Sequence, residues 1–124
     1  MNRFIIITVF AVLISHNGWC QPDAYKVGEC VYYTIHYGPI TAGTGTLELK
    51  PATYNEMPVW HAKMVGKTTG MADAIFKVLD IYESYLDPAT ELPVFTIRNI
   101  REGRYRKYNE VIFDHTTRAD SAIL

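Results

Sequence analysis

Cysteine, long apolar runs and net charge are all scarce in this chain of 124 residues. Its two cysteines allow one disulfide at most, which excludes a scaffold held together by several disulfides. The longest apolar run, residues 4–14, is about half the roughly 20 residues that a membrane-spanning helix needs, and no later run approaches that length. The formal net charge is −1, so overall charge indicates no class of partner.

The N-terminus has the pattern of a secretory signal peptide. Arg3 precedes the apolar run, and polar and small residues follow it. We predict cleavage after Cys20, because Gly18 and Cys20 then occupy the third-last and last positions of the signal, where small residues are required. The alternative is a lipid-modified Cys20, but Asn17 and Trp19 match a lipoprotein signal poorly.

Cleavage there makes residues 1–20 the signal peptide and residues 21–124 a single β domain. Cys30 is then the sole cysteine, predicted as a half-buried strand residue, and no intramolecular disulfide can form. We expect an exported protein, in the periplasm or associated with the outer membrane of a diderm bacterium, with no transmembrane segment after signal removal. Residues 116–124 begin after a turn and do not complete the predicted sheet, whose last strand would remain unpaired. We therefore expect a domain that is incomplete at its C-terminus.

Alternating apolar and polar residues predict one strand after another along the mature chain. The predicted strands are residues 29–37, 42–49, 59–65, 78–86, 94–101 and 104–115. The stretch GMADAIFKV, which begins at Gly70, predicts one or two helical turns, too short for a crossover between parallel strands. The fold class is therefore mainly β, an antiparallel curved sheet or open half-barrel of about six strands with one short helix.

The stretch AGTGTLEL places Gly43 and Gly45 on the same side of its strand as two leucines. A glycine inside a strand brings no side chain to pack, so two of them indicate that something bulky lies against this surface. We predict that they make room for the rings of Tyr33 and Tyr37 on the preceding strand, with any ligand in contact beyond those rings.

Two segments carry a family resemblance, YKVGECVYYTIHYGPITAGTGTLEL and FKVLDIYESYLDPATELPVFTIRNIREGRYRKYNEVIFDH. They resemble the family called domain of unknown function 3108, most specifically at residues 28–29, 42–43, 82–85 and 98–103. The resemblance implies an exported bacterial β-protein without an established activity, and an N-terminal portion or truncated form of a longer chain. The pattern around DPATELP is also similar to the half-barrels of periplasmic lipoprotein carriers, which bind acyl chains or lipoproteins.

No catalytic or metal-binding motif is evident. His36, His61 and His115 fall on three predicted strands, but each is at an outward position without a closely spaced ligand partner, which favours surface histidines over a zinc site. Ser84 and Cys30 belong to no nucleophile motif, and no glycine-rich phosphate loop is present. We expect no enzyme, no cofactor and no bound metal.

The segment RNIREGRYRKY, residues 98–108, is strongly basic. Export argues against nucleic acid, so Arg104 and Arg106 either contact anionic head groups or belong to a solvated hairpin tip. In the second case the arginines are expected to form cross-strand ion pairs with Glu83, Glu91 and Glu110. Arg98 shares a face with apolar residues, so we predict a structural pair with Asp80, the one acid expected to face inward.

These observations leave two hypotheses of function. The first is a binding module, in which the curved sheet holds an amphiphile or lipid and the short helix covers its mouth. Its candidate ligand-binding residues are Tyr33, Tyr37, Gly43, Gly45, Trp60, Arg104 and Arg106. The second is a structural or protein-interaction module of the cell envelope, with a self-filled core and no small ligand.

Overall fold

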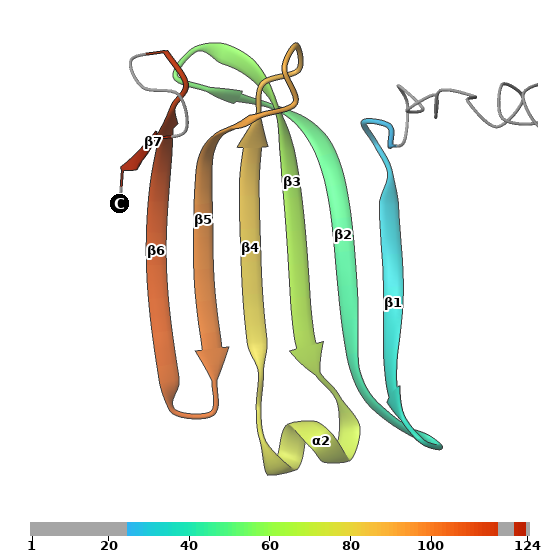
Figure 1. Ribbon diagram of the computed structural model, residues 1–124. Coiled ribbons are helices and arrows are strands. Elements are labelled where there is room, and N and C mark those ends of the chain that lie inside the picture. The colour runs from blue at the N-terminus through green and yellow to red at the C-terminus, as the bar shows by residue number, and fades with distance from the viewer. Residues whose placement is uncertain (1–24, 117–120, 124) are drawn as a thin grey trace, which may run out of the picture.

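The computed structural model describes residues 25–116 and 121–123. They form one antiparallel sheet of seven strands and one helix, α2 (Gly70–Ile75) (Figure 1). The strands are β1 (Cys30–Tyr37), β2 (Ile40–Tyr54), β3 (Met57–Thr68), β4 (Leu79–Leu86), β5 (Pro93–Glu102), β6 (Tyr105–Asp114) and β7 (Ser121–Ile123). The predicted fold class, an open antiparallel sheet with one short helix, is confirmed.

The strands lie side by side in the order in which they occur in the chain, so β1 and β7 are the edges of an open sheet. Asn55 and Glu56 both have positive φ and form a two-residue turn between β2 and β3, a turn geometry that matches the twist of the paired strands. The Asp87 carboxylate accepts hydrogen bonds from the Ala89 N–H (2.9 Å) and the Thr90 hydroxyl (3.1 Å). These bonds stabilise the predicted turn before β5.

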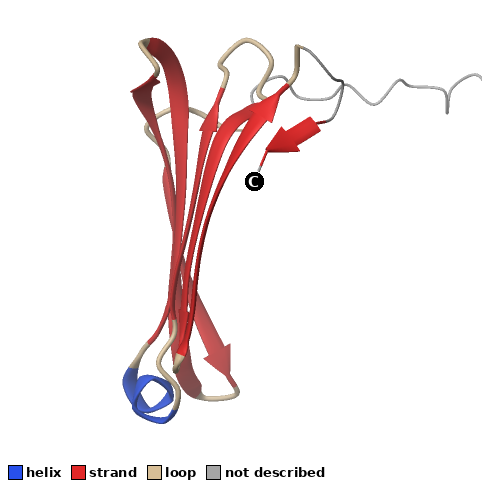
Figure 2. Ribbon diagram, turned by 90° about the vertical axis from the view of Figure 1, so that its left-hand side faces the viewer, coloured by secondary structure: helices blue, strands red, loops and turns tan. Residues whose placement is uncertain are grey.

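The described sheet is a single layer with two exposed faces. Seen from its edge it bends along its length, with α2 at one end (Figure 2). We call the face that carries Gly45 and Leu49 of β2, with their cross-strand partners, the A face; the face that carries Thr46 is the B face. Among the described apolar residues, only Leu49 (8% exposed) and Val59 (3%) are buried. Large apolar side chains therefore remain accessible on both faces.

Strand β2 is longer than predicted and continues through Pro51. Proline lacks the N–H with which a strand residue bonds to its neighbour on one side. On the side of β2 that faces β1, the last backbone hydrogen bonds are made by Leu49. Its N–H donates to the Glu29 carbonyl, and its carbonyl accepts from the Gly28 N–H. Beyond that point β2 has no described neighbour on the β1 side, so Pro51 removes no ladder hydrogen bond there.

The two strand glycines of β2 have different roles. Gly45 lies opposite Tyr33, and a Cβ added to Gly45 would lie 3.6 Å from the Tyr33 Cβ, so the predicted contact between these residues is confirmed. Gly43 is buried, and a Cβ there would lie only 2.7 Å from the carbonyl oxygen of Lys67 in β3. Gly43 therefore permits close approach of two backbones rather than of an aromatic ring.

Tyr37 is not part of this arrangement. The register of β1 and β2 shifts between Ile35 and His36, so Ile35 lies opposite Gly43 and Tyr37 pairs with Ile40. Tyr37 is 82% exposed. The prediction that Tyr37 lies against the glycines is wrong, because Ile35 takes the position opposite Gly43 and Tyr37 lies beside the β1–β2 turn.

Helix α2 connects β3 to β4 at the end of the sheet. The Thr68 hydroxyl donates to Asp73 (2.9 Å) and accepts from the Val78 N–H (2.9 Å), which joins the two ends of this connection. The helix thus occurs where the sequence predicts it, but at the sheet end rather than over one face (Figure 2). Cys30 was expected to be half-buried; it is exposed, because it begins an edge strand.

Candidate functional site

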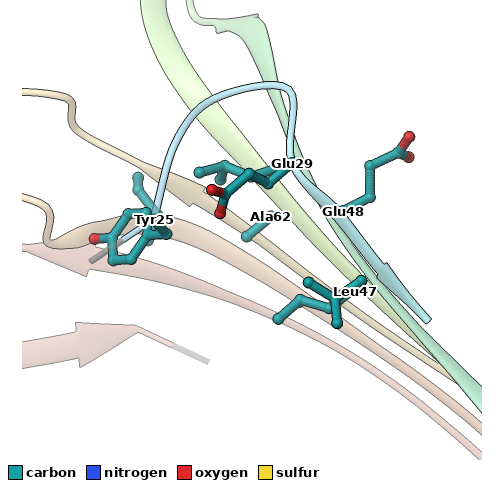
Figure 3. Close-up of a pocket in the computed structure, with 8 residues that line it drawn as sticks. Tyr25, Glu29, Leu47, Glu48 and Ala62 are labelled. Carbon is teal, nitrogen blue, oxygen red and sulfur yellow. The ribbon is translucent and has the colours of Figure 1, made fainter. Parts of the chain in front are cut away.

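An apolar hollow lies on the A face, at the end of the sheet away from α2. We call it the A-face hollow, and its volume is about 210 Å³. In Figure 3 Tyr25 and Leu47 face each other across it, and Ala62 lies between them. Its lining residues are Tyr25, Glu29, Val31, Leu47, Glu48, Leu49, Ala62 and Leu86. The hollow is smaller than the roughly 300–1,000 Å³ of a drug-sized ligand site, so it suits one apolar part of a larger molecule.

Tyr25 forms one wall of the A-face hollow. Its ring meets the Trp60 ring edge-on, with 6.2 Å between centroids. A side-chain hydrogen bond to Glu91 is the main cause that raises the pKa of Tyr25, and desolvation adds to it. The bond to Glu91 connects the segment before β1 to the β4–β5 turn.

The two glutamates beside the A-face hollow lie at its rim or point away from it. Figure 3 shows Glu29 above the hollow and Glu48 pointing away from it. Glu48 alternates with Leu47 and Leu49, so its side chain belongs to the B face. It forms an ion pair with Lys50 there, 2.6 Å between Nζ and Oε1. The hollow is thus lined mainly by carbon, with one carboxylate at its rim.

The predicted ligand-binding residues do not gather in one place. Trp60 lies near the A-face hollow, opposite Pro51 and Leu86. Tyr33 and Gly45 lie together in the middle of β1 and β2. The other predicted residues, Tyr37, Gly43, Arg104 and Arg106, lie toward or at the α2 end (Figure 1). The predicted combination of an aromatic pocket with an arginine rim is therefore not formed.

The predicted Asp80–Arg98 pair is wrong. Arg98 is exposed and donates from Nη2 to the Asn109 side chain in β6 (3.3 Å). Asp80 instead accepts the backbone N–H of Arg101 (3.0 Å). Asp80 lies opposite Gly66, whereas Arg98 lies opposite Tyr82 and Asn109, so each side chain finds a nearer partner.

The expected ion pairs of the basic hairpin are also not formed. Glu83 pairs with His61, and Glu110 accepts a hydrogen bond from Tyr108. Arg106 donates from Nη1 to the carbonyl oxygens of Gly103 (2.8 Å) and Tyr105 (2.7 Å). Within residues 25–116 and 121–123, no basic side chain of residues 98–107 pairs with a carboxylate. Their positive charge is therefore not neutralised by the described sheet.

The B face carries an aromatic cluster that the sequence analysis missed. Tyr85 stacks on His61 with 4.6 Å between centroids and also contacts Phe95 (5.6 Å), which stacks on Tyr54 (5.0 Å). His61 Nε2 lies 2.7 Å from Glu83 Oε2. Burial, followed by the charge of Glu83, raises the pKa of Tyr85. This acid–base pair lies on the face opposite the hollow, within packed rings, so we assign it a packing role.

The other two histidines have separate partners. His36 Nδ1 lies 3.4 Å from the Thr41 hydroxyl, and His115 Nε2 lies 2.7 Å from the Pro93 carbonyl oxygen. No group of three metal-ligating side chains occurs in the described part of the chain. In the same residues, no helix is long and apolar enough to cross a membrane.

Comparison with family models identifies residues 32–121 as a match to DUF3108, described as a protein of unknown function. That match covers most of the chain. The chain belongs to the DUF3108 family. No curated protein and no solved structure gives a significant match to this DUF3108 chain. The family resemblance inferred from the sequence is therefore confirmed, and it assigns no activity.

The A-face hollow of this DUF3108 protein is lined largely by residues that sequence reasoning did not select. The sequence signal for this hollow was the alternation of β2, which places Leu47 and Leu49 on the face that carries the glycines. Ala62 and Leu86 are added by the pairing of β2, β3 and β4, which depends on register. Tyr25 precedes the first strand and no periodic pattern includes it.

Proposed function

We propose that this DUF3108 protein is a non-enzymatic exported envelope protein that holds the apolar part of an amphiphile against its A face. The observation that carries the proposal is the A-face hollow, a carbon-lined depression in a sheet face whose large apolar side chains remain accessible. Burial of apolar surface from an acyl chain would provide the binding free energy, at about 25 cal/mol per Å².

The A face also offers a path along which an acyl chain can extend. Val31, Tyr33 and Ile35 follow one another along β1, and each faces a β2 residue of the A face. Gly66, which pairs with Gly45, has open space where a side chain would be, so it does not obstruct that path. A second depression, lined in part by Ile35, Gly43 and Gly66, lies further toward α2. An extended chain fits this surface better than a compact ligand does.

A lysine at the A-face hollow should weaken this binding strongly. We expect Leu47→Lys to weaken the affinity for a fluorescent fatty acid by about ten-fold or more, because an ammonium group would lie among apolar side chains. Thr46→Lys is the matched control, since it adds the same charge one residue away on the B face and should leave the affinity unchanged. Fluorescence titration, with displacement by unlabelled fatty acid, measures both.

Equal affinities of the two lysine variants, or no saturable binding by the parent chain, would overturn the carrier proposal. The structural or protein-interaction module would then be the better account. One observation favours that second function: all eight residues of β1 are exposed, and its outer edge has no described strand beside it.

Export is a separate part of the proposal, with its own test. We expect the mature protein to begin at Gln21, so its N-terminal peptide should start at that residue and carry no acyl group. Mass spectrometry of protein isolated from a secreting host measures this directly. A chain that begins at Cys20 and carries additional acyl mass would instead identify a lipoprotein, and an uncleaved chain would contradict export.

A further inference from the structure

Two connections meet at the α2 end of the sheet. The Gly103 N–H of the β5–β6 turn donates to the Lys77 carbonyl (2.7 Å), and the Phe76 ring lies directly against Gly103. On the other side of the helix, the Thr69 N–H donates to the Ala42 carbonyl of β2 (3.1 Å). We call residues 70–77 together with residues 101–107 the α2 tip. The helix and the basic hairpin are thus neighbours at the same end of the sheet (Figure 1).

The apolar side chains of the α2 tip have no cover. Met71 is 67% exposed, Ile75 is 83% exposed and Phe76 is 53% exposed, and no residue of α2 is buried. A surface helix normally turns its apolar side chains toward the protein core. Here Met71 and Ile75 remain largely exposed, so the helix gains little from packing against the described chain. An apolar partner outside the described residues would cover them.

Positive charge surrounds these apolar side chains. The α2 tip and the adjoining strand ends contain six basic and three acidic residues, namely Lys67, Lys77, Arg101, Arg104, Arg106 and Lys107 against Asp73, Asp80 and Glu102. Two of the acids already accept hydrogen bonds, Asp73 from Thr68 and Asp80 from the Arg101 N–H. Arg101 and Arg106 lie directly opposite each other, an arrangement of like charges that is unfavourable without an anion.

We propose that the α2 tip docks on the surface of a membrane that contains anionic lipids. Met71 and Ile75 enter the boundary between head groups and acyl chains, while the arginines and lysines contact the anionic head groups. Exposed apolar side chains within a basic surround are the combination that interfacial binding requires. A soluble polyanion would use the charges alone, and an apolar protein surface would leave the charges without partners. This inference goes beyond the proposed function, because it does not require the A-face hollow to be occupied.

Vesicle co-sedimentation of the full mature chain tests the proposal. We expect binding to phosphatidylcholine vesicles that contain phosphatidylglycerol, and much weaker binding to phosphatidylcholine alone. Arg104→Gln and Arg106→Gln should each weaken binding about five-fold, because each basic residue near an anionic surface contributes a comparable factor. Lys26→Gln, which removes a charge at the opposite end of the sheet, should have no effect.

The apolar contribution has a matched control in a second exposed methionine. Met71→Ser should weaken binding to the anionic vesicles, whereas Met57→Ser, in the β2–β3 hairpin at the far end, should not. Ile75→Trp keeps the position apolar and should show a blue shift of its emission on adding anionic vesicles. Met57→Trp should show none. These readouts separate membrane entry from a loss of folding.

Three outcomes would overturn the docking proposal: no binding to anionic vesicles, equal effects of the tip variants and their controls, or a loss on arginine removal without any effect of Met71→Ser and no shift for Ile75→Trp. The third would indicate that charge alone holds the protein to the vesicle, without entry of the apolar side chains. Leu47→Lys should retain vesicle binding, so failure of the carrier proposal and failure of tip docking give different results.

Discussion

Replacing Gly43 with alanine should lower the free energy of unfolding by about 3 kcal/mol, whereas the same replacement at Gly45 should be neutral or slightly stabilising. The added Cβ at Gly43 would lie 2.7 Å from the Lys67 carbonyl oxygen. That oxygen belongs to the backbone of a paired strand and cannot rotate away, so β2 and β3 would have to separate locally.

Gly45 is the matched control for this prediction. Its added Cβ would lie 3.6 Å from Tyr33 and 3.9 Å from the Val65 carbonyl oxygen, which are ordinary contacts. Alanine there also reduces the conformational freedom of the unfolded chain, which favours folding. Urea unfolding of the two variants and the parent provides the comparison. A loss at Gly45 equal to that at Gly43 would show that the close approach of β3 is not the cause.

Tyr85→Ala should also be strongly destabilising, by about 3 kcal/mol. Tyr85 is the central ring of the B-face cluster and contacts His61, Phe95 and Tyr54. Its removal would take away the ring that these three rings share and would expose their facing surfaces to water. In a sheet with two buried apolar side chains among those described, this cluster is the main site of side-chain packing.

Tyr32→Ala on the same face serves as the control for Tyr85→Ala. Tyr32 is exposed on the edge strand, so its loss should change the free energy of unfolding by no more than about 0.5 kcal/mol. Thermal and urea unfolding of both variants measure the difference. Similar small losses for the two would mean that ring stacking on the B face contributes little to stability.

The elements of the sheet could be predicted because each has a local signal. Alternation identified β1 and β4, and the Asp87 turn and the hairpin after Glu102 were marked by residues with strong turn preferences. Side-chain partners were less predictable, because they depend on register. Ile35 rather than Tyr37 lies opposite Gly43, and an unpaired Ala42 in β2 then shifts the register of the last β1 residues.

The Asp80–Arg98 prediction failed for a related physical reason. Sharing a face with apolar residues suggested that Arg98 is buried, but the described sheet is one layer and that face is accessible to solvent. An exposed arginine needs no carboxylate, and the amide of Asn109 is its direct cross-strand neighbour. Whether a strand face is covered is a property of the assembled layers, which alternation within one strand does not encode.

The meander order of the strands has a kinetic consequence. Every strand pairs with the strand that precedes or follows it in the chain, so each hairpin can form without waiting for a distant segment. Low contact order of this kind favours fast folding for a β-protein. It also makes the sheet behave as a nearly one-dimensional array, in which each strand is stabilised mainly by its two neighbours and opening proceeds inward from the edges.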